Sequence, residues 1–398
     1  MIGVSKLMVD TKNYGDSLRY SSDVQGAKCG TTLNRGPVVV WNCTKTCNLK
    51  CIHCYAGSDA QKYENELTTT EAVKFIDDLH RFRVPVILFS GGEPLLREDI
   101  LYLAQYATNK GIRTTFSTNG TLINQHTAQK LKEIGVGYVG ISLDGLGENN
   151  DKFRGKKGAF DLALRGIRNC LAVEQKVGLR FTINRHNHRE LESIFNLIEE
   201  ERIPRVCFYH LAYSGRGNSM VNQDITHGET RAALDLIYEK VKYFKNKKIE
   251  KEILTVDNHA DGIYIYLKLL KENNPMAQHA FNLLKINGGN RTGIAIGAVD
   301  WFGNVHPDQF TQNYTFGNVR ERSFGDIWTD TSHPILSGLK DRKKLLKGRC
   351  VQCKWLDMCN GNFRSRAEAV SGDFWQEDPA CYLTDEEIGI TEKVVCNG

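Results

Sequence analysis

Short β-rich runs recur six times along this 398-residue chain, and segments with helical periodicity separate them. The runs cover residues 38–41, 86–90, 113–117, 138–143, 177–183 and 206–211. Helical periodicity is clearest at residues 69–82 and 128–134. Strands that alternate with helices form parallel strands joined by helical crossovers. The pattern therefore predicts an α/β fold whose active site lies at the C-terminal ends of the strands.

Composition and charge exclude several classes of protein. Hydrophobic residues make up 41% of the chain, and no apolar run approaches the roughly 18 residues that a membrane span needs. The net charge of +5 comes from basic residues scattered among acids, so neither a nucleic acid nor a membrane is expected as a partner. The first residues lack the apolar segment of a secretory signal, which predicts a cytoplasmic protein.

Four parts are expected along the chain. Residues 1–34 have weak periodicity and are predicted to form an irregular leader, and residues 35–217 hold the strand-and-helix core. Residues 218–290 are mainly helical in pattern and are interpreted as a linker or lid. Residues 291–398 are rich in cysteine and carry hairpin-like turn signals at Gly303-Asn304 and Gly317-Asn318.

Four of the twelve cysteines lie in the stretch from Cys43 to Cys54, directly after the first predicted strand. In a reducing compartment such a group indicates metal or redox chemistry. Cys47, Cys51 and Cys54 can supply three thiolates from one tight loop, which suits an iron-sulfur cubane with one open iron. Zinc, with His53 or Cys43 as a fourth ligand, is the alternative. Cys43 lies closer to the strand, and we interpret it as a packed small hydrophobe.

Polar and glycine-rich stretches follow the next three predicted strands. The second strand is followed by Gly91-Gly92-Glu93-Pro94, whose glycines permit close approach of a ligand to the backbone, although a plain turn is the simpler interpretation. Thr118-Asn119-Gly120 and Asp144-Gly145 follow the third and fourth strands. Because parallel strands end at the same edge of the sheet, we expect these stretches to share one site with the cysteine loop.

A second cysteine group lies near the C-terminus. It consists of Cys350, Cys353, Cys359 and Cys381. Four thiolates can fully ligate a second cubane or, alternatively, a structural zinc. The remaining cysteines are isolated in sequence and are assigned no role: Cys29, Cys170, Cys207 and Cys396.

The CX3CX2C loop at the end of the first strand resembles the signature of the radical SAM superfamily. The resemblance implies a partial (β/α)6 barrel and a [4Fe-4S] cluster whose open iron binds S-adenosylmethionine, which is cleaved to a 5'-deoxyadenosyl radical that abstracts a substrate hydrogen. It also implies that Cys47, Cys51 and Cys54 are the cluster ligands, and that Arg154 pairs with the carboxylate of S-adenosylmethionine. The other implied contacts of this cofactor are Gly91, Gly92, Glu93, Pro94, Ser117, Asn119, Ser142 and Thr182, with Asn184 as a further ribose candidate.

The C-terminal region resembles the SPASM/Twitch extension of that superfamily, whose full seven-cysteine pattern holds two auxiliary clusters. Two positions depart from the pattern, because Asp308 and Phe363 stand where cysteines of the first auxiliary cluster are expected. The resemblance therefore implies one auxiliary [4Fe-4S] cluster, ligated by the four C-terminal cysteines, and two clusters in total.

A finer resemblance links the stretches 41–51, 359–368 and 377–387 to the NirJ, AhbC and AhbD group, and the opening residues to its AhbC and NirJ1-type branch. It implies an iron-tetrapyrrole substrate such as 12,18-didecarboxysiroheme, removal of its acetate arms in heme or heme d1 biosynthesis, and an electron donor such as ferredoxin or flavodoxin. Propionate removal in the heme d1 branch and SPASM-type modification of a ribosomal peptide are the alternatives. A non-catalytic iron-sulfur or zinc scaffold is a third.

A substrate with several carboxylates needs cations in its pocket. Candidate arginines near strand ends or in the C-terminal region are Arg205, Arg216, Arg291, Arg364 and Arg366. Most arginines in any protein only face solvent or form ion pairs, which is the simpler interpretation. His210, His259 and His306 are candidate axial ligands of the substrate iron, although a lone histidine is more often structural.

Overall fold

A computed structural model describes residues 1–13, 15–21 and 26–390 of the chain. Its strands form one ten-stranded sheet in the order β1-β8-β7-β6-β5-β4-β3-β2-β9-β10. The strands are β1 (Ile2–Gly3), β2 (Val38–Asn42), β3 (Val86–Ser90), β4 (Arg113–Thr118), β5 (Tyr138–Ser142), β6 (Val177–Ile183), β7 (Arg205–His210), β8 (Glu252–Val256), β9 (Ile296–Val299) and β10 (Val305–His306). Every neighbouring pair from β2 to β8 is parallel, as the alternating pattern predicts.

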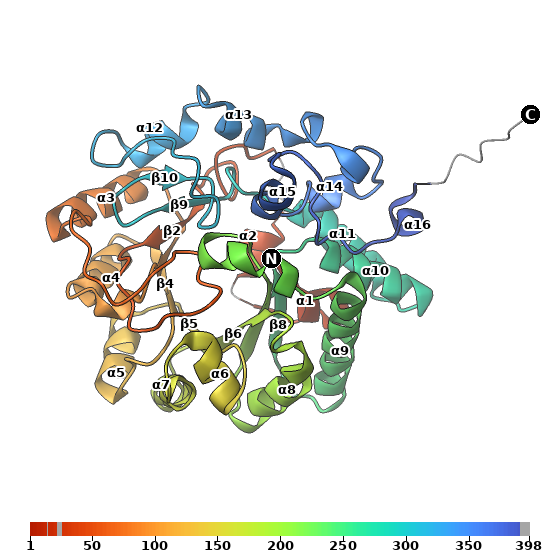
Figure 1. The fold of residues 1–398 in the computed structure, drawn as a ribbon, viewed down its shortest axis with the longest axis horizontal. Helices are drawn as coiled ribbons and strands as arrows, with labels where there is room; N and C mark the ends of the chain where they lie inside the picture. The colour runs from red at the N-terminus through yellow and green to blue at the C-terminus, as the bar shows by residue number, and fades with distance from the viewer. Residues whose placement is uncertain (14, 22–25, 391–398) are drawn as a thin grey trace, which may run out of the picture.

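Helices follow one another around the outside of the curved sheet, from orange to green in Figure 1. They are α3 (Thr69–Arg81), α4 (Ile100–Asn109), α5 (Gln125–Ile134), α6 (Gly147–Arg154), α7 (Ala159–Ala172), α8 (Leu191–Glu200) and α9 (His227–Asn246). Local sequence explains where they begin: Thr68 caps α3 in a capping box with Glu71, and Thr226 does the same for α9 with Glu229. The predicted (β/α)6 core is therefore confirmed.

Strand β6 shows how this arrangement creates an interior site. Leu179 and Phe181 are fully buried, in the main hydrophobic core. Arg180 and Thr182 alternate with them and line a cavity on the opposite, inner face of the sheet. Successive strand side chains point to opposite faces, so one strand supplies both the core and the site.

The sheet is larger than the sequence predicts. Ile2–Gly3 pairs with β8, and the following helix α1 (Val4–Val9) buries Val4, Leu7 and Met8, so the expected irregular leader is ordered over its first nine residues. Strand β8 lies inside the segment expected to be a helical linker or lid, and it continues the parallel sheet beyond β7. These additions supply hydrogen-bond partners for a strand edge that six strands alone would leave open.

The C-terminal part joins the same sheet at its other edge. Strand β9 pairs in parallel with β2 and forms a hairpin with β10 around Gly303-Asn304, where the turn signal was read. Short helices complete this part, shown in blue in Figure 1. They include α12 (Phe324–Thr329), α13 (Pro334–Lys340), α14 (Leu356–Cys359), α15 (Arg364–Ser371) and α16 (Asp385–Ile388). Helices α10 (Ala260–Lys271) and α11 (Ala277–Asn287) link it to β8. Among the described residues, none of the helices has the length and apolarity that crossing a bilayer would require.

Candidate active site

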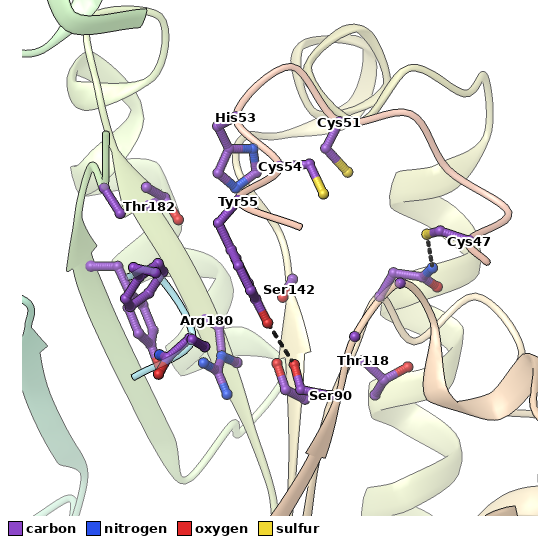
Figure 2. A pocket seen from close by; sticks show the side chains of 18 of the residues that line it. Cys47, Cys51, His53, Cys54, Tyr55, Ser90, Thr118, Ser142, Arg180 and Thr182 are labelled. Atoms are coloured by element: carbon purple, nitrogen blue, oxygen red, sulfur yellow. Dashed lines mark hydrogen bonds between the residues drawn. The ribbon is translucent and has the colours of Figure 1, made fainter. Parts of the chain in front are cut away.

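A pocket of about 1020 Å³ lies at the C-terminal ends of the parallel strands. Its walls come from the loops and last residues of β2 to β7, so the stretches that follow different strands do meet in one place (Figure 2). The predicted site residues that line it are Cys47, Cys51, Cys54, Gly91, Gly92, Ser117, Asn119, Ser142, Arg154 and Thr182.

The three clustered cysteines face a common space at the mouth of this pocket (Figure 2). Polar donors point at two of the sulfurs: the backbone N–H of Leu49 lies 3.4 Å from Cys47 Sγ, and Arg154 Nη1 lies 3.6 Å from Cys51 Sγ. Burial raises the pKa of the Cys47 thiol to about 12. Such donors stabilise sulfur that carries negative charge, as a ligating thiolate does. The loop can thus hold a three-thiolate cluster with the fourth side open to the pocket.

Cys43 has a different environment from these three thiols. It is fully buried in the main core, and its Sγ donates to the carbonyl oxygen of Ser90 at 3.3 Å. Burial raises its pKa to about 12. Cys43 therefore packs as the sequence predicts.

Arg216, in the segment after β7, fixes the cysteine loop through hydrogen bonds to its backbone. Its Nε donates to the carbonyl oxygen of Cys51 at 2.8 Å, and its Nη1 donates to that of Ser58 at 2.9 Å. Neighbouring Gly215 has a φ of +56°, and a Cβ there would lie 2.3 Å from the carbonyl oxygen of Tyr55. Arg216 also lines the upper pocket, and its Nη2 has no hydrogen-bond partner among the described residues, so the observed contacts assign it to the cysteine loop and do not test the expected pairing with substrate.

The glycines after β3 pack directly against the same loop. A Cβ on Gly91 would lie 2.3 Å from the carbonyl oxygen of Thr44, and one on Gly92 would lie 2.2 Å from that of Thr46. Gly92 N and Glu93 N donate to these two carbonyls at 2.7 and 2.9 Å. Glycine is therefore needed here because the backbone after β3 packs closely against the cysteine loop, as well as lining the pocket.

Glu93 and Pro94 lie behind the pocket wall, which differs from their expected contact with S-adenosylmethionine. The Glu93 carboxylate is fully buried and accepts hydrogen bonds from Thr118 Oγ1 at 2.7 Å, Asn119 N at 2.8 Å and Leu95 N at 3.1 Å. Burial raises its pKa, although these donors oppose the shift. Glu93 thus ties the loop after β3 to the loop after β4, and acts on the pocket through them.

Arg154 reaches the pocket and already has a partner. Its guanidinium forms an ion pair with buried Asp144, whose Oδ1 also accepts from Thr182 N at 2.7 Å. Burial opposes the charge on Arg154, but Asp144 and Cys51 outweigh it and raise the pKa of Arg154. The Arg154 Nε is buried and has no hydrogen-bond partner among the described residues.

The polar residues at the ends of β4, β5 and β6 differ in whether they line the pocket. Ser117 and Ser142 line the pocket, and Asn119 binds Asn48 through its Nδ2 at 2.8 Å. Asn184 lies outside the pocket, fully buried, where its side chain donates to the carbonyl oxygen of Thr182 at 2.9 Å. Asn184 is therefore a structural residue here, and the expectation of a ribose contact is not supported.

The four C-terminal cysteines line a second, smaller cavity. It has a volume of about 480 Å³ and includes Cys350, Cys353, Cys359 and Cys381 among its lining residues. Burial raises the pKa of Cys350 to about 11 and that of Cys381 to about 12. A cavity enclosed by four thiols fits a fully ligated cubane. No group of three or more potential ligands in the described part of the chain converges on a single metal ion.

A third cavity, of about 1520 Å³, fills the interior of the sheet below the first pocket. Seven residues line both: Val40, Leu88, Arg180, Tyr209, Asp257, Gln309 and Phe310. We call this space the lumen cavity. Asp308 and Phe363, which replace cysteines of the seven-cysteine pattern, both line it. Gly289 lines it too, and a Cβ there would lie 2.2 Å from the carbonyl oxygen of Cys359, so the C-terminal cysteine cavity is adjacent.

The candidate substrate arginines divide into two sets. Arg205 and Arg291 line the lumen cavity, where Arg205 lies 3.4 Å from Glu252, and Arg291 donates to the carbonyl oxygens of residues 27, 30 and 31. Arg364 and Arg366 are buried outside both cavities. Arg364 binds backbone carbonyls, and Arg366 pairs with Asp378 at 2.7 Å. The last two are therefore structural, because their charges are satisfied within the protein.

The three candidate histidines lie in three different places relative to the cavities. His306 donates from its Nδ1 to the carbonyl oxygen of Tyr314 at 2.8 Å, its Nε2 lies 3.4 Å from Asp300, and the residue lines neither cavity. His210 lines the upper pocket, with its Nε2 2.9 Å from Asp261. His259 lines the lumen cavity, and its Nδ1 has no hydrogen-bond partner among the described residues. Burial lowers the pKa of His259 well below its usual value.

Sequence reasoning missed several residues of the site. Tyr55, Arg180, Tyr209 and Phe310 all line the upper pocket. The sequence could have indicated Arg180, because a charged residue in the middle of the apolar run from Val177 to Ile183 is unusual. It gave no such indication for Tyr55 and Phe310, because their rings meet, at 5.1 Å between centroids, only through the tertiary fold.

Comparisons with known proteins agree with this geometry. Residues 41–198 match the radical SAM superfamily, and residues 295–365 match the iron-sulfur cluster-binding SPASM domain. A structure of SuiB from Streptococcus suis bound to S-adenosylmethionine has the same fold, with a TM-score of 0.70 and 18% identity over 88% of this chain and 78% of that one.

Two curated relatives are far more similar in sequence. The chain is 57% identical to Fe-coproporphyrin III synthase of Methanosarcina barkeri, over 98% of this chain and 100% of the relative. It is 43% identical to pre-heme d1 synthase of Dinoroseobacter shibae, over 89% of this chain and 88% of the relative. The chain is therefore an enzyme of the radical SAM superfamily with a C-terminal SPASM domain, and it belongs to the tetrapyrrole-modifying NirJ and AhbC group.

Proposed function

We propose that this enzyme removes the two acetate arms of 12,18-didecarboxysiroheme to give Fe-coproporphyrin III. The observation that carries the proposal is the 57% identity, along the whole relative, to a protein named for that product. The lumen cavity supports it, because this space adjoins the upper pocket and is lined by cationic side chains, which a substrate with several carboxylates needs.

The cofactors follow from the family: S-adenosylmethionine, a radical SAM [4Fe-4S] cluster and an auxiliary [4Fe-4S] cluster. We assign the first cluster to Cys47, Cys51 and Cys54, because these thiols share the mouth of the upper pocket. We assign the auxiliary cluster to Cys350, Cys353, Cys359 and Cys381, because these four share one cavity. Reductive cleavage of S-adenosylmethionine supplies a 5'-deoxyadenosyl radical that can abstract hydrogen from a substrate arm.

The pocket residues would bind and orient S-adenosylmethionine. Gly91 and Gly92 offer backbone to its amino group, Arg154 offers its guanidinium to its carboxylate, and Ser117, Ser142 and Thr182 line the space for its ribose. Glu93 and Asn119 hold the loops that carry these groups. A small electron donor such as ferredoxin or flavodoxin would supply the electron.

His259 is the histidine best placed to contact the substrate iron. His259 lines the lumen cavity, its Nδ1 is buried with no hydrogen-bond partner among the described residues, and its Nε2 is 3.3 Å from the nitrogen of Met1. Because burial keeps the ring neutral, a lone pair is available to a metal. Absorption spectra of the bound iron tetrapyrrole should change in His259→Ala and remain unchanged in His306→Ala, because His306 lines neither the upper pocket nor the lumen cavity. Unchanged spectra in both variants would remove this contact.

The reaction itself is tested by anaerobic incubation of the reconstituted enzyme with S-adenosylmethionine, a reductant and 12,18-didecarboxysiroheme. Mass spectrometry should show loss of two acetate arms. Loss of propionate arms instead would place the enzyme with the heme d1 branch, which the 43% identity to pre-heme d1 synthase makes the second candidate. An unaltered tetrapyrrole with cleaved S-adenosylmethionine would refute the proposed substrate.

A further inference from the structure

Arg180 occupies the point where the two large cavities join. It lies in the middle of β6 with its side chain on the inner face of the sheet, and it lines both the upper pocket and the lumen cavity. In Figure 2 its guanidinium lies below the cysteine loop. Any molecule that extends from one cavity into the other must pass this side chain.

Arg180 also differs from the other cavity arginines in what it binds. No hydrogen bond or ion pair joins its guanidinium to any described residue, whereas Arg205 pairs with Glu252, and Arg216 and Arg291 bind backbone carbonyls. Its guanidinium makes a cation-π contact instead, with the guanidinium carbon 4.8 Å from the centre of the Tyr209 ring. A guanidinium stays charged at every physiological pH, so a partly buried one without a counter-ion favours an anion beside it.

Neighbouring residues leave space for the Arg180 side chain but do not supply a counter-ion for its charge. Residue 140 of the neighbouring strand is glycine, and a Cβ there would lie 2.7 Å from Arg180 Cδ. Asp257 is an acid that lines the same two cavities, but no ion pair connects it with Arg180. The position is therefore built to hold an unpaired cation over an aromatic face.

The position of Arg180 along β6 places it next to residues assigned to the cofactor. Thr182, assigned above to S-adenosylmethionine, follows on the same face of the same strand, and the rise of two strand residues is about 6.6 Å. Ser142, also assigned to that cofactor, is the register partner of Arg180 on β5. An anion bound by Arg180 would therefore lie level with Ser142 and below Thr182, at the lower side of the space assigned to the cofactor.

We propose that Arg180 binds the carboxylate of the substrate arm that is processed, and so positions that arm beneath S-adenosylmethionine. This inference rests on the proposed function, since it takes the substrate to be a tetrapyrrole with carboxylate arms. The planar fork of the guanidinium can bind both carboxylate oxygens, which fixes the direction of the arm as well as its place. Arg180 is in this sense a positioning and specificity residue for hydrogen abstraction.

The test uses reconstituted full-length enzyme in three variants: Arg180→Gln, Arg180→Lys and the control Arg322→Gln. Arg322 is exposed and pairs only with Asp330 and a backbone carbonyl on the surface, so the same substitution there should change nothing. Each protein is given 12,18-didecarboxysiroheme or its methyl ester, in which the arm carboxylates are masked. Binding is followed by the tetrapyrrole absorption spectrum, and 5'-deoxyadenosine and the shortened product are counted in parallel.

We expect Arg180→Gln to lower kcat/KM for the acid by about 30-fold or more, the scale of losing one partner of a desolvated charge pair. Cleavage of S-adenosylmethionine should continue, so that more 5'-deoxyadenosine forms per product. The preference for acid over ester should shrink in Arg180→Gln, and Arg180→Lys should restore part of it. The inference would be overturned if Arg180→Gln kept both the wild-type preference for acid over ester and the wild-type amount of 5'-deoxyadenosine formed per product. This holds even if the variant were less stable.

The same experiment separates this inference from the proposed function. If the wild-type enzyme shortens the tetrapyrrole and Arg180→Gln does so equally well, only the role of Arg180 is refuted. If the wild-type enzyme cleaves S-adenosylmethionine but neither binds nor alters the tetrapyrrole, the proposed function is refuted, and the role of Arg180 is refuted with it.

Discussion

The carboxylate of Glu93 accepts a hydrogen bond from Thr118 Oγ1 at 2.7 Å, and this contact joins the loops that follow β3 and β4. A second bond from Asn119 N, at 2.8 Å, completes the link. Glu93 is fully buried, so its acidic group is a structural element of the pocket wall. The relationship explains how a residue can shape a cofactor site without lining it.

Glu93→Gln should weaken binding of S-adenosylmethionine. The amide nitrogen of glutamine is a donor and would face N–H and O–H groups that are donors too, leaving buried polar groups unpaired at a cost of about 1–3 kcal/mol. We expect a dissociation constant raised about tenfold and a lower melting temperature, measured by equilibrium binding and thermal unfolding. Glu98→Gln is the matched control, because Glu98 is exposed. Equal binding by both variants would contradict the role of Glu93.

Cys51→Ala should lose the radical SAM cluster and retain the auxiliary one. Iron content should fall by about four atoms per chain, and reductive cleavage of S-adenosylmethionine should cease. Cys43→Ala is the control from the same stretch, because Cys43 is packed in the core. It should keep its iron and lose only about 1–2 kcal/mol of stability from the small cavity. Iron loss in Cys43→Ala alone would reassign the ligands.

Cys381→Ala should remove the auxiliary cluster while leaving cleavage of S-adenosylmethionine in place. The reason is spatial, since the four C-terminal cysteines line a cavity separate from the upper pocket. Iron analysis should again show a loss of about four atoms per chain, now with 5'-deoxyadenosine still formed. Cys29→Ala, at a thiol outside both groups, should retain all iron. Loss of cleavage in Cys381→Ala would mean that the two sites are not independent.

Arg216→Ala should loosen the cysteine loop. The substitution leaves the carbonyl oxygens of Cys51 and Ser58 without their donor, which costs about 1–3 kcal/mol for each group that stays buried. We expect incomplete iron incorporation and faster bleaching of the cluster in air, measured by absorbance. Arg216→Lys keeps a cation and should lessen both effects. If cluster content stayed normal in Arg216→Ala and only tetrapyrrole affinity fell, Arg216 would be a substrate residue after all.

Asp257→Asn should make the folded enzyme more stable at neutral pH. Burial raises the pKa of Asp257 from 3.8 to about 6, so the folded state holds a proton that the unfolded chain loses near pH 4. Ionisation therefore costs the folded state free energy, and stability decreases as pH rises from about 4 to about 6. Removing the charge should recover about 1–3 kcal/mol at pH 7 and none at pH 4.

Thermal unfolding of Asp257→Asn and wild type across pH 4 to 8 measures this difference. Asp161→Asn is the control, since Asp161 is an exposed acid in α7. A stability difference that did not grow between pH 4 and pH 6 would show that Asp257 ionises normally in the folded protein.

The sequence by itself determined the parallel core and the chemistry of its upper edge. Six strands appear where alternating patterns predict them, and the cysteine loop, Gly91-Gly92, Asn119 and Ser142 meet at the strand ends. This succeeds because hydrophobic periodicity and motif spacing are local properties, and because parallel strands bring the residues after each strand to one edge.

Only the tertiary structure decided which charged groups remain free. Arg216, Arg364 and Arg366 are candidate substrate cations by sequence, yet the first two donate to backbone carbonyls and the third pairs with Asp378. Arg180, which the sequence did not single out, has no such partner among the described residues. Similarly, Ile2–Gly3 and β8 extend the sheet by pairing residues about 250 positions apart. The availability of a charge depends on neighbours that are distant in sequence, so no local pattern can report it.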